Sequence, residues 1–359
     1  MLIGEAQEEE KTPEESVDHP HPSILHLMYS QNNMAKSPEM LWLDAIEADE
    51  SGNRDEALSL AEEVVSIDEN HSDAWMGVAQ WILPVDERGR QLMPDLAQAS
   101  KSMSALRRVV DLNPDNEHAW RLGGEIIVGH LGMLEDGLKW WERRKEIAPS
   151  DIAPYFEQAF ILISMGYFDR AEECLDVMDS IVAKQPSKPL EARARRLREI
   201  FMEEAKLEGE VGFEPQNSRD ESWGLITRMS KKKPITETYF LIMFVMPIVF
   251  LLGTLSMYLF SGVRFGTGIV MILIIVMYFG IARISRGLLL KVNRPEKFLN
   301  RALDHESTTG KLCIPDDLRS SKLYAHLMKS RMPAFKQRLG LIEDSGEKLP
   351  GNWELKIPF

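Results

Sequence analysis

The chain has 359 residues and a net charge of −14, with 44% hydrophobic and 27% charged residues, a composition that excludes disorder throughout. Residues 1–237 carry 47 acidic and 26 basic side chains and residues 238–359 carry 9 and 16, which gives net charges of −21 and +7. The acidic part should be repelled by nucleic acid and by anionic lipid, so we expect no nucleic-acid partner, whereas the basic part can lie against a lipid surface.

Residues 1–36 are predicted to form a disordered acidic tail, because they combine charge with few apolar side chains. They lack the basic opening and apolar core of a signal peptide. His19 and His21 have too few companions to predict a metal site. Cys174 and Cys313 are far apart in the sequence and favour two reduced thiols in a cytoplasmic compartment.

Four stretches of the acidic half share one layout, with a turn followed by an amphipathic run. They are "GNRDEALSLAEEVVSIDENHSDAW", "SALRRVVDLNPDNEHAW", "GMLEDGLKWWERRKEIAPSD" and "GYFDRAEECLDVMDS". Gly132 and Gly166 are 34 residues apart. Trp75 and Trp120 are 45 apart, which is one period with an insertion of 11 that we assign to the turn at residues 83–95. A fixed period of this length predicts stacked helical hairpins.

This layout resembles the tetratricopeptide repeat (TPR), a helical hairpin with small and aromatic residues at set positions. The matching positions are Gly52, Gly132 and Gly166 in turns, Ala57, Gly137 and Ala171 in second helices, Trp75 and Trp120 in first helices, and Pro114 and Pro149 at repeat ends. The resemblance implies an all-α fold with a TPR-like α-solenoid of about four hairpins over residues 37–205, including a charged terminal cap helix. Glu69 departs from the pattern, because it stands where a terminal proline is expected.

Members of this family usually hold a peptide or a partner helix in a groove lined by their first helices. The residues that the resemblance places in such a groove are Trp42, Met76, Gln80, Arg121, Glu125, Phe156 and Phe160. The lysine and asparagine clamp with which the best-known members grip a terminal carboxylate is absent. A mixed apolar and acidic groove would prefer basic or apolar segments. We interpret Trp75 and Trp120 as core residues.

Residues 206–236 have the glycine, proline, asparagine and serine content of a linker. Residues 239–260 then form an uncharged run of 22, about 33 Å as a helix, and residues 265–282 an uncharged run of 18, about 27 Å. Both fall within the range that spans a hydrocarbon core. The link between them is so short that the helices must be antiparallel neighbours. We therefore expect two transmembrane helices within residues 237–283.

The flanking cations predict the orientation of this hairpin. They are Lys231, Lys232 and Lys233 before the first helix, and Arg283 and Arg286 after the second. The connecting loop carries Arg264 alone. Positive charge stays on the cytoplasmic side, so we expect a two-pass integral membrane protein with both termini in the cytoplasm.

Residues 284–359 are expected to form a basic juxtamembrane segment and a small, mostly helical C-terminal region. The juxtamembrane part is amphipathic and suited to lie along anionic headgroups. The remainder is too small to hold much core of its own, so we expect it to pack on the repeat stack or on a partner. Its ending, "WELKIPF", suits a short strand or a docking peptide.

No phosphate-binding glycine loop, HExxH helix, GxSxG elbow or CxxC pair is present. We interpret the scattered histidines, among them His71, His118, His130 and His305, as surface or capping residues. The chain is therefore expected to be no enzyme and to need no cofactor. Two hypotheses remain open: a membrane-anchored scaffold that recruits a protein partner, and a structural or assembly subunit of a membrane complex. A channel formed by oligomerised hairpins is a distant third.

Overall fold

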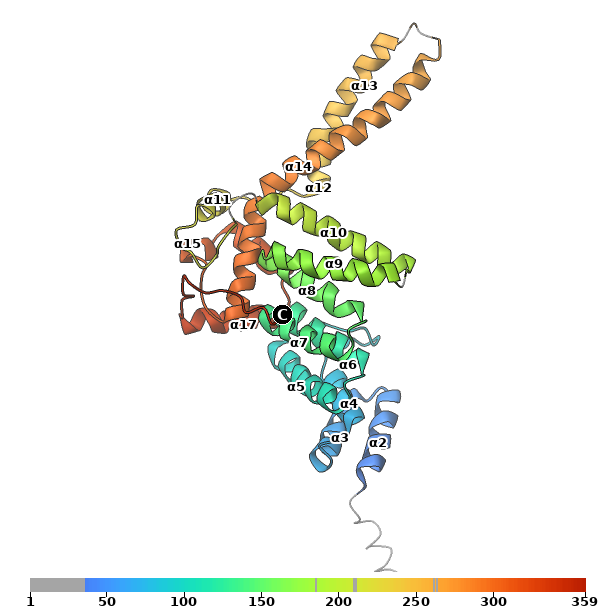
Figure 1. Cartoon of the computed structure of the whole chain (residues 1–359), viewed down its shortest axis with the longest axis vertical. Coiled ribbons are helices and arrows are strands. Elements are labelled where there is room, and N and C mark those ends of the chain that lie inside the picture. Colours follow the sequence, from blue (N-terminus) through green and yellow to red (C-terminus); the bar gives the residue numbers. More distant parts are fainter. Residues whose placement is uncertain (1–35, 185, 209–211, 261, 263) are drawn as a thin grey trace, which may run out of the picture.

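The computed structural model describes residues 36–184, 186–208, 212–260, 262 and 264–359. The expected acidic tail, with His19 and His21, lies outside the described residues except for Lys36. The described residues form helices, with isolated bridges in place of strands. The fold is all-α, as predicted, and Figure 1 shows a stack of helical hairpins from which one long helical hairpin projects.

Four hairpins form a TPR-like solenoid. They are α2–α3 (Pro38–Glu50, Arg54–Ile67), α4–α5 (Ser72–Trp81, Leu96–Leu112), α6–η1–α7 (Glu117–Gly124, Glu125–His130, Leu134–Ile147) and α8–α9 (Ile152–Met165, Phe168–Lys184). The cap helix α10 (Lys188–Glu208) packs on α9. The predicted insertion is the loop between α4 and α5, in which Val85 and Gln91 form an antiparallel bridge.

Aromatic residues repeat one contact along the stack, which explains the repeat pattern physically. The indole nitrogen of Trp75 donates to the carbonyl of Glu69 at 2.9 Å, and that of Trp120 donates to Pro114 at 2.8 Å. Each ring thus binds the end of the preceding hairpin to the start of its own. Trp120 is buried, and the half-buried Trp75 packs against the same core. The interpretation as a core residue is confirmed for Trp120, whereas Trp75 lies at the edge of the core.

Two adjacent glycines let α6 and α7 approach closely. A Cβ on Gly123 would lie 2.3 Å from the ring of Trp140, and one on Gly124 would lie 2.1 Å from Trp141. The rings therefore occupy the volume that side chains on α6 would fill. The following turn, η1, is a π-helix, a widened form that is uncommon and short.

The helix that follows the apolar hairpin differs from the prediction. The expected end near residue 283 falls inside α14 (Gly266–Thr309), a single helix of 44 residues. Its last turns enter the helical body, where Phe298, Leu299 and Ala302 are buried, so they do not form the expected headgroup-facing surface. Apolar residues recur at helical spacing in this segment, so it has a buried face.

The predicted linker is also more ordered than a free tether. Within it, α11 (Ser222–Met229) packs on α14. Trp223 and Ile226 of α11 are buried in a second core, which α14 shares with the C-terminal helices. These helices are α15 (Asp316–Arg319), α16 (Lys322–Ser330) and α17 (Pro333–Ser345). The small C-terminal region thus packs on the body rather than holding a core alone.

The C-terminal helices dock along the turns inside the hairpins. The Gln337 side chain of α17 accepts from the Leu96 amide at 2.7 Å, at the start of α5. A Cβ on Gly132, before α7, would lie 2.5 Å from Phe335, and one on Gly166, before α9, would lie 2.7 Å from the Arg301 guanidinium. One edge of the stack is therefore covered by α14 and α17.

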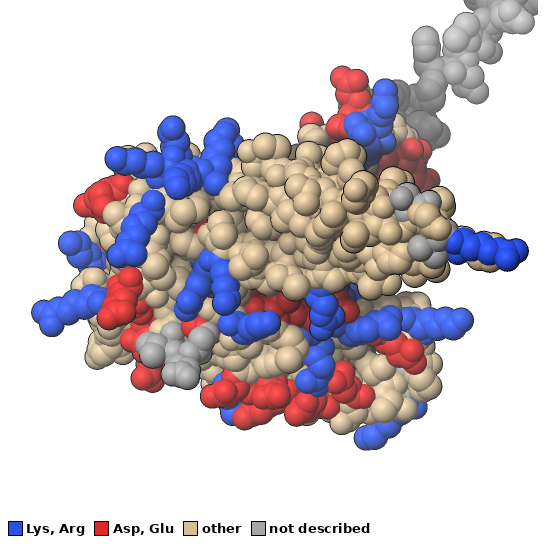
Figure 2. Space-filling view, turned by 90° about the horizontal axis from the view of Figure 1, so that it is seen from above, with Lys and Arg blue, Asp and Glu red and all other residues tan. Residues whose placement is uncertain are grey.

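The apolar hairpin projects from this body. Its first arm runs over α12 (Glu237–Phe240), the π-turn η2 (Leu241–Val245) and α13 (Met246–Phe260), and its second arm is the start of α14. Within their most apolar windows only 22% and 6% of residues are buried, so neither arm is a soluble core helix. Figure 2 shows uncharged surface over the projecting part and charged side chains on the body around it.

Candidate partner-binding surface

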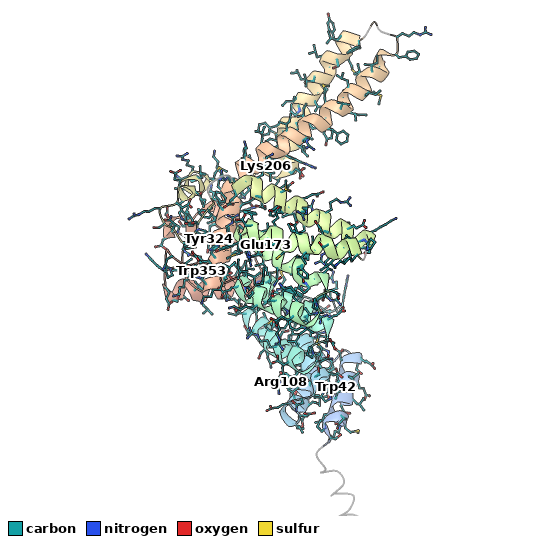
Figure 3. The ribbon with its side chains drawn as sticks, in the orientation of Figure 1. Trp42, Arg108, Glu173, Lys206, Tyr324 and Trp353 are labelled. Carbon is teal, nitrogen blue, oxygen red and sulfur yellow. The ribbon has the colours of Figure 1, made fainter. Side chains whose placement is uncertain are left out.

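The predicted groove residues all lie on first helices of the stack, but they differ in exposure. Trp42 is half-buried, with its ring 5.5 Å from both Trp81 and His71. Met76 is half-buried and packs against the solenoid core. His71 caps α4 by accepting from the Ala74 amide at 3.0 Å, as interpreted. Figure 3 locates Trp42 in the first hairpin.

The middle of the predicted groove is polar. Gln80 lies 2.7 Å from the His118 ring nitrogen and so joins α4 to α6. Arg121 is exposed and lies 3.9 Å from Glu117. Glu125 is also exposed, 3.9 Å from His130. The exposed Arg121–Glu117 pair contributes little to stability, and the exposed Glu125 faces only a buried histidine, so both charges remain available to a ligand.

The interpretation of His130 and His305 as surface or capping residues is wrong. His130 is 7% exposed and His305 is 3% exposed. Burial lowers the pKa of both imidazoles, for His305 to about 4. The His305 ring packs 5.2 Å from the ring of Trp353. Both rings are neutral core residues at pH 7, because desolvation disfavours the charged form.

The end of the predicted groove is aromatic. The Arg193 guanidinium of α10 covers the ring of Phe156 at 3.8 Å and pairs with Glu157 at 3.0 Å. Burial raises the pKa of Glu157, and the Arg193 charge opposes that shift. Phe160, one turn further along α8, is 41% exposed. Of these two rings Phe160 is the one that a partner can reach directly.

Phe160 lines a cavity of about 420 Å³ between α8, α10, α14 and α16. The other lining residues are Ile163, Ser164, Ile200, Glu204, Glu296, Lys297, Asn300, Arg301, Leu327 and Ser330. Burial raises the pKa of Glu296 in its wall, against the opposing charges of His326 and Lys297. The cavity extends the predicted groove onto α14 and α16, which the resemblance does not include.

Buried ion pairs fix the helices around this cavity. Arg301 of α14 donates to both carboxylate oxygens of Glu208 at 2.6 and 2.7 Å, and both side chains are under 10% exposed. Arg331 donates to Asp304 at 2.6 Å. The sequence reasoning missed these pairs. The one signal for them is a charge inside an otherwise apolar helical stripe, "KFLNRALDH".

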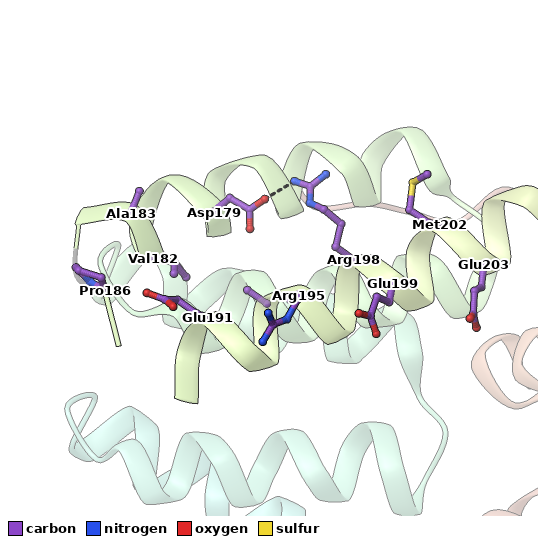
Figure 4. A pocket seen from close by; sticks show the side chains of 11 residues that line it. Asp179, Val182, Ala183, Pro186, Glu191, Arg195, Arg198, Glu199, Met202 and Glu203 are labelled. Carbon is purple, nitrogen blue, oxygen red and sulfur yellow. Dashed lines mark hydrogen bonds and ion pairs between the residues drawn. The ribbon is translucent and has the colours of Figure 1, made fainter. Parts of the chain in front are cut away.

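A second cavity, of about 770 Å³, lies between α9 and α10 (Figure 4). Its walls combine apolar Val182 and Met202 with charged Arg195 and Arg198. Arg198 is already bound by the chain's own acids, since it donates to Asp179 at 2.5 Å (Figure 4). The arginines of α10 therefore serve in part to hold the cap helix to the stack.

The base of the apolar hairpin is joined across its two arms. The Asn293 side chain accepts from the Ile235 amide at 3.1 Å and donates to its carbonyl at 2.8 Å. Arg286 donates to Glu237 at 3.3 Å. The other predicted flanking cations, Lys231, Lys232, Lys233 and Arg283, are exposed. Within the described residues no group of three or more His, Cys, Asp or Glu could hold a metal ion.

Comparisons with known proteins give little beyond this geometry. No protein-family model matches the chain, and no curated protein matches it. Among solved structures, a MamA double mutant is 18% identical over 48% of this chain and 89% of its own, with a TM-score of 0.34. MamA from Desulfovibrio magneticus RS-1 is 13% identical over 47% and 97%, with a TM-score of 0.32. PilW, described as a widely conserved type IV pilus biogenesis factor, is 15% identical over 55% and 87%, with a TM-score of 0.31. At these TM-scores the likeness carries no argument about function.

Proposed function

We propose that this chain is a membrane-anchored TPR-like scaffold that binds a protein partner on the cytoplasmic face of a membrane. The observation that carries the proposal is α14, one helix that belongs both to the exposed apolar hairpin and to the body of the stack. Such a connection holds the solenoid at a fixed position relative to the lipid, which a flexible tether would not do.

The proposed binding surface runs from Arg121 and Glu125 to Phe160 and its cavity. It offers an exposed aromatic ring, Phe160 on α8, and exposed charges of both signs, Arg121 on α6 and Glu125 on η1. Aromatic anchors beside polar positions are the usual centre of a protein interface. The role is recruitment without catalysis, so the chain takes a peptide or helix and transforms no substrate.

The test compares partner capture by the full chain in mild detergent with capture by a groove variant carrying Arg121→Ala, Phe156→Ala and Phe160→Ala. Capture is expected to fall at least tenfold, because truncation of an aromatic hot spot costs about 2 kcal/mol or more and a tenfold change corresponds to about 1.4 kcal/mol. Leu341→Ala, which removes a side chain that is 61% exposed on α17, is the matched control. Undiminished capture by the groove variant would show that this surface does not bind the partner.

The alternative function, a structural or assembly subunit, is favoured by the exposed apolar faces of both hairpin arms. A second variant separates the two functions. Residues 238–282 are replaced by a short flexible linker, which the Ile235 and Asn293 contact can accommodate because it holds the two ends together. Partners retained by this variant support the scaffold, and partners lost with the hairpin support the subunit.

A further inference from the structure

Residues 353–359 cross the solenoid as an extended segment with a strict alternation of burial. Leu355 is buried in the solenoid core, and Trp353, Ile357 and Phe359 pack against that core. The residues between them, Glu354, Lys356 and Pro358, are exposed. This period of two is the pattern of an extended chain with one buried face. The segment nevertheless forms no strand.

Side chains of α7, of α9 and of the turn between α8 and α9 hold this segment. The Leu355 amide donates to the hydroxyl of Tyr167 at 3.1 Å. The Phe359 ring lies 4.2 Å from the Lys145 ammonium and 5.5 Å from the Arg170 guanidinium. Arg170 also donates to the backbone oxygen of Phe359. Cations over an aromatic face together with a bonded backbone oxygen form a specific anchor.

The connection that leads to the segment is exposed and separate from the second core. Leu349 is fixed by its amide, which donates to Leu312 at 2.7 Å. Pro350, Gly351 and Asn352 then follow as an exposed turn. None of residues 353–359 belongs to the core that α11, α14, α16 and α17 share. Departure of the segment would uncover His305 of α14, against which Trp353 packs, but would leave the second core covered.

We infer that the surface formed by α7, α9 and the turn between α8 and α9 is a peptide-binding site, occupied in cis by residues 353–359, and that a partner protein's extended segment with apolar side chains at every second residue takes its place. The bound segment itself defines the chemistry: a leading aromatic, two aliphatic residues and a final aromatic beneath Lys145 and Arg170. This site is distinct from the proposed groove. Phe359 is held by Lys145, which also lies over the ring of Tyr155, and the groove residues Phe156 and Phe160 take no part in that contact.

A tethered segment masks such a site until a competitor overcomes its high effective concentration. The experiment places a site-specific protease sequence between Gly351 and Asn352 of the full chain in detergent. A labelled synthetic peptide, WELKIPF, is then added before and after cleavage. Cleavage is expected to raise the apparent affinity on the order of a hundredfold, since it removes the tether. Helical circular dichroism of the body should stay unchanged.

Two controls test the contacts. In the cleaved chain, Arg170→Ala is expected to weaken peptide binding about tenfold, because it removes a charge-assisted hydrogen bond and a cation over the ring. Arg143→Ala, on the exposed surface of α7 and paired with Asp111, should change nothing. A peptide with aspartate at the Leu355 and Ile357 positions should not bind.

Three results would overturn the inference. The first is a cleaved chain that stays helical but takes up no labelled peptide. The second is loss of helix on cleavage, which would make the segment part of the core rather than a ligand. The third is a dimer of the uncleaved chain that the peptide dissociates, which would make a second copy the occupant. A groove variant at Phe160 should reduce partner capture without changing uptake of the WELKIPF peptide, whereas Arg170→Ala should do the reverse, so failure here and failure of the proposed function are distinguishable.

Discussion

The turn glycines have two roles at the scale of single residues. Gly52, Gly132 and Gly166 all have positive φ, between 66° and 86°, which favours glycine. A Cβ on Gly52 would meet open space, whereas one on Gly166 would meet the guanidinium of Arg301. Arg301 is 5% exposed, and its guanidinium is hydrogen-bonded to Glu208. The guanidinium therefore cannot move away from an added methyl group.

These two glycines form a matched pair of substitutions. Gly52→Ala should cost about 1 kcal/mol, the penalty for an alanine in the left-handed region. Gly166→Ala should cost about 3 kcal/mol or more, because it adds disruption of a buried ion pair. Chemical denaturation in detergent measures both. Equal losses at the two positions would show that α14 does not press on the Gly166 turn.

His305 predicts a pH dependence. Burial lowers its pKa from 6.5 to about 4, and the Arg301 charge acts in the same direction. The unfolded chain thus binds more protons between these values, so the stability from neutral His305 is full above pH 6.5 and is lost as the pH falls through 4. The loss amounts to about 3 kcal/mol below pH 4.

His305→Phe should remove this contribution while keeping a ring against Trp353. Burial raises the pKa of the neighbouring Asp304 and Glu306, which gives the opposite slope, so the difference between wild type and variant isolates the histidine. Melting temperatures at pH 7, 5 and 4 measure it. A difference that does not change with pH would contradict a buried neutral imidazole.

At the scale of elements, the repeat helices followed from the sequence and α14 did not. The repeat is visible in a single sequence, because contacts between neighbouring hairpins recur at a fixed spacing. Gly132 and Gly166 mark this spacing in the turns, and Trp75 and Trp120 mark it in the first helices. The course of α14 depends instead on where Arg301 finds Glu208, 93 residues earlier in the chain. A period within one segment cannot reveal such a long-range partner. For this reason the basic, amphipathic face of α14 was predicted to lie against lipid headgroups.

Asn293 joins the two arms of the hairpin where they meet the body. Asn293→Ala removes both hydrogen bonds to Ile235, each contributing about 1 kcal/mol, and should loosen the connection before α12. Trypsin is expected to cut after Lys231 and Lys232 several-fold faster in this variant, because cleavage follows local opening. Asn217→Ala, in another turn of the same region, is the control. Equal cutting rates in the Asn293→Ala variant and the unsubstituted chain would show that Asn293 does not hold the two arms together.

At the scale of the whole molecule, the sequence located the stack and the apolar hairpin, whereas the cavity at Phe160 emerged from the structure alone. The apolar hairpin could be predicted because the length and lack of charge expected of a membrane span are properties of a single segment. The cavity could not, since its walls come from α8, α10, α14 and α16. The groove residues named from the resemblance therefore remain a prediction, which the structure extends toward α14.

The central claim is that lipid holds the hairpin while both soluble parts stay on the cytoplasmic side. The two native cysteines should react little with a thiol label. Burial raises the pKa of Cys174 to about 11 and raises that of Cys313, which disfavours the reactive thiolate. Single cysteines are introduced at Arg264, in the hairpin loop, and at Ser37 or Lys348, on the body.

A membrane-impermeant maleimide is then applied to sealed cells. The account predicts labelling of Arg264→Cys alone, with the Ser37→Cys and Lys348→Cys chains reacting only after the cells are opened. Labelling of either body position from outside, or recovery of the intact chain in the supernatant of a carbonate wash, would contradict it.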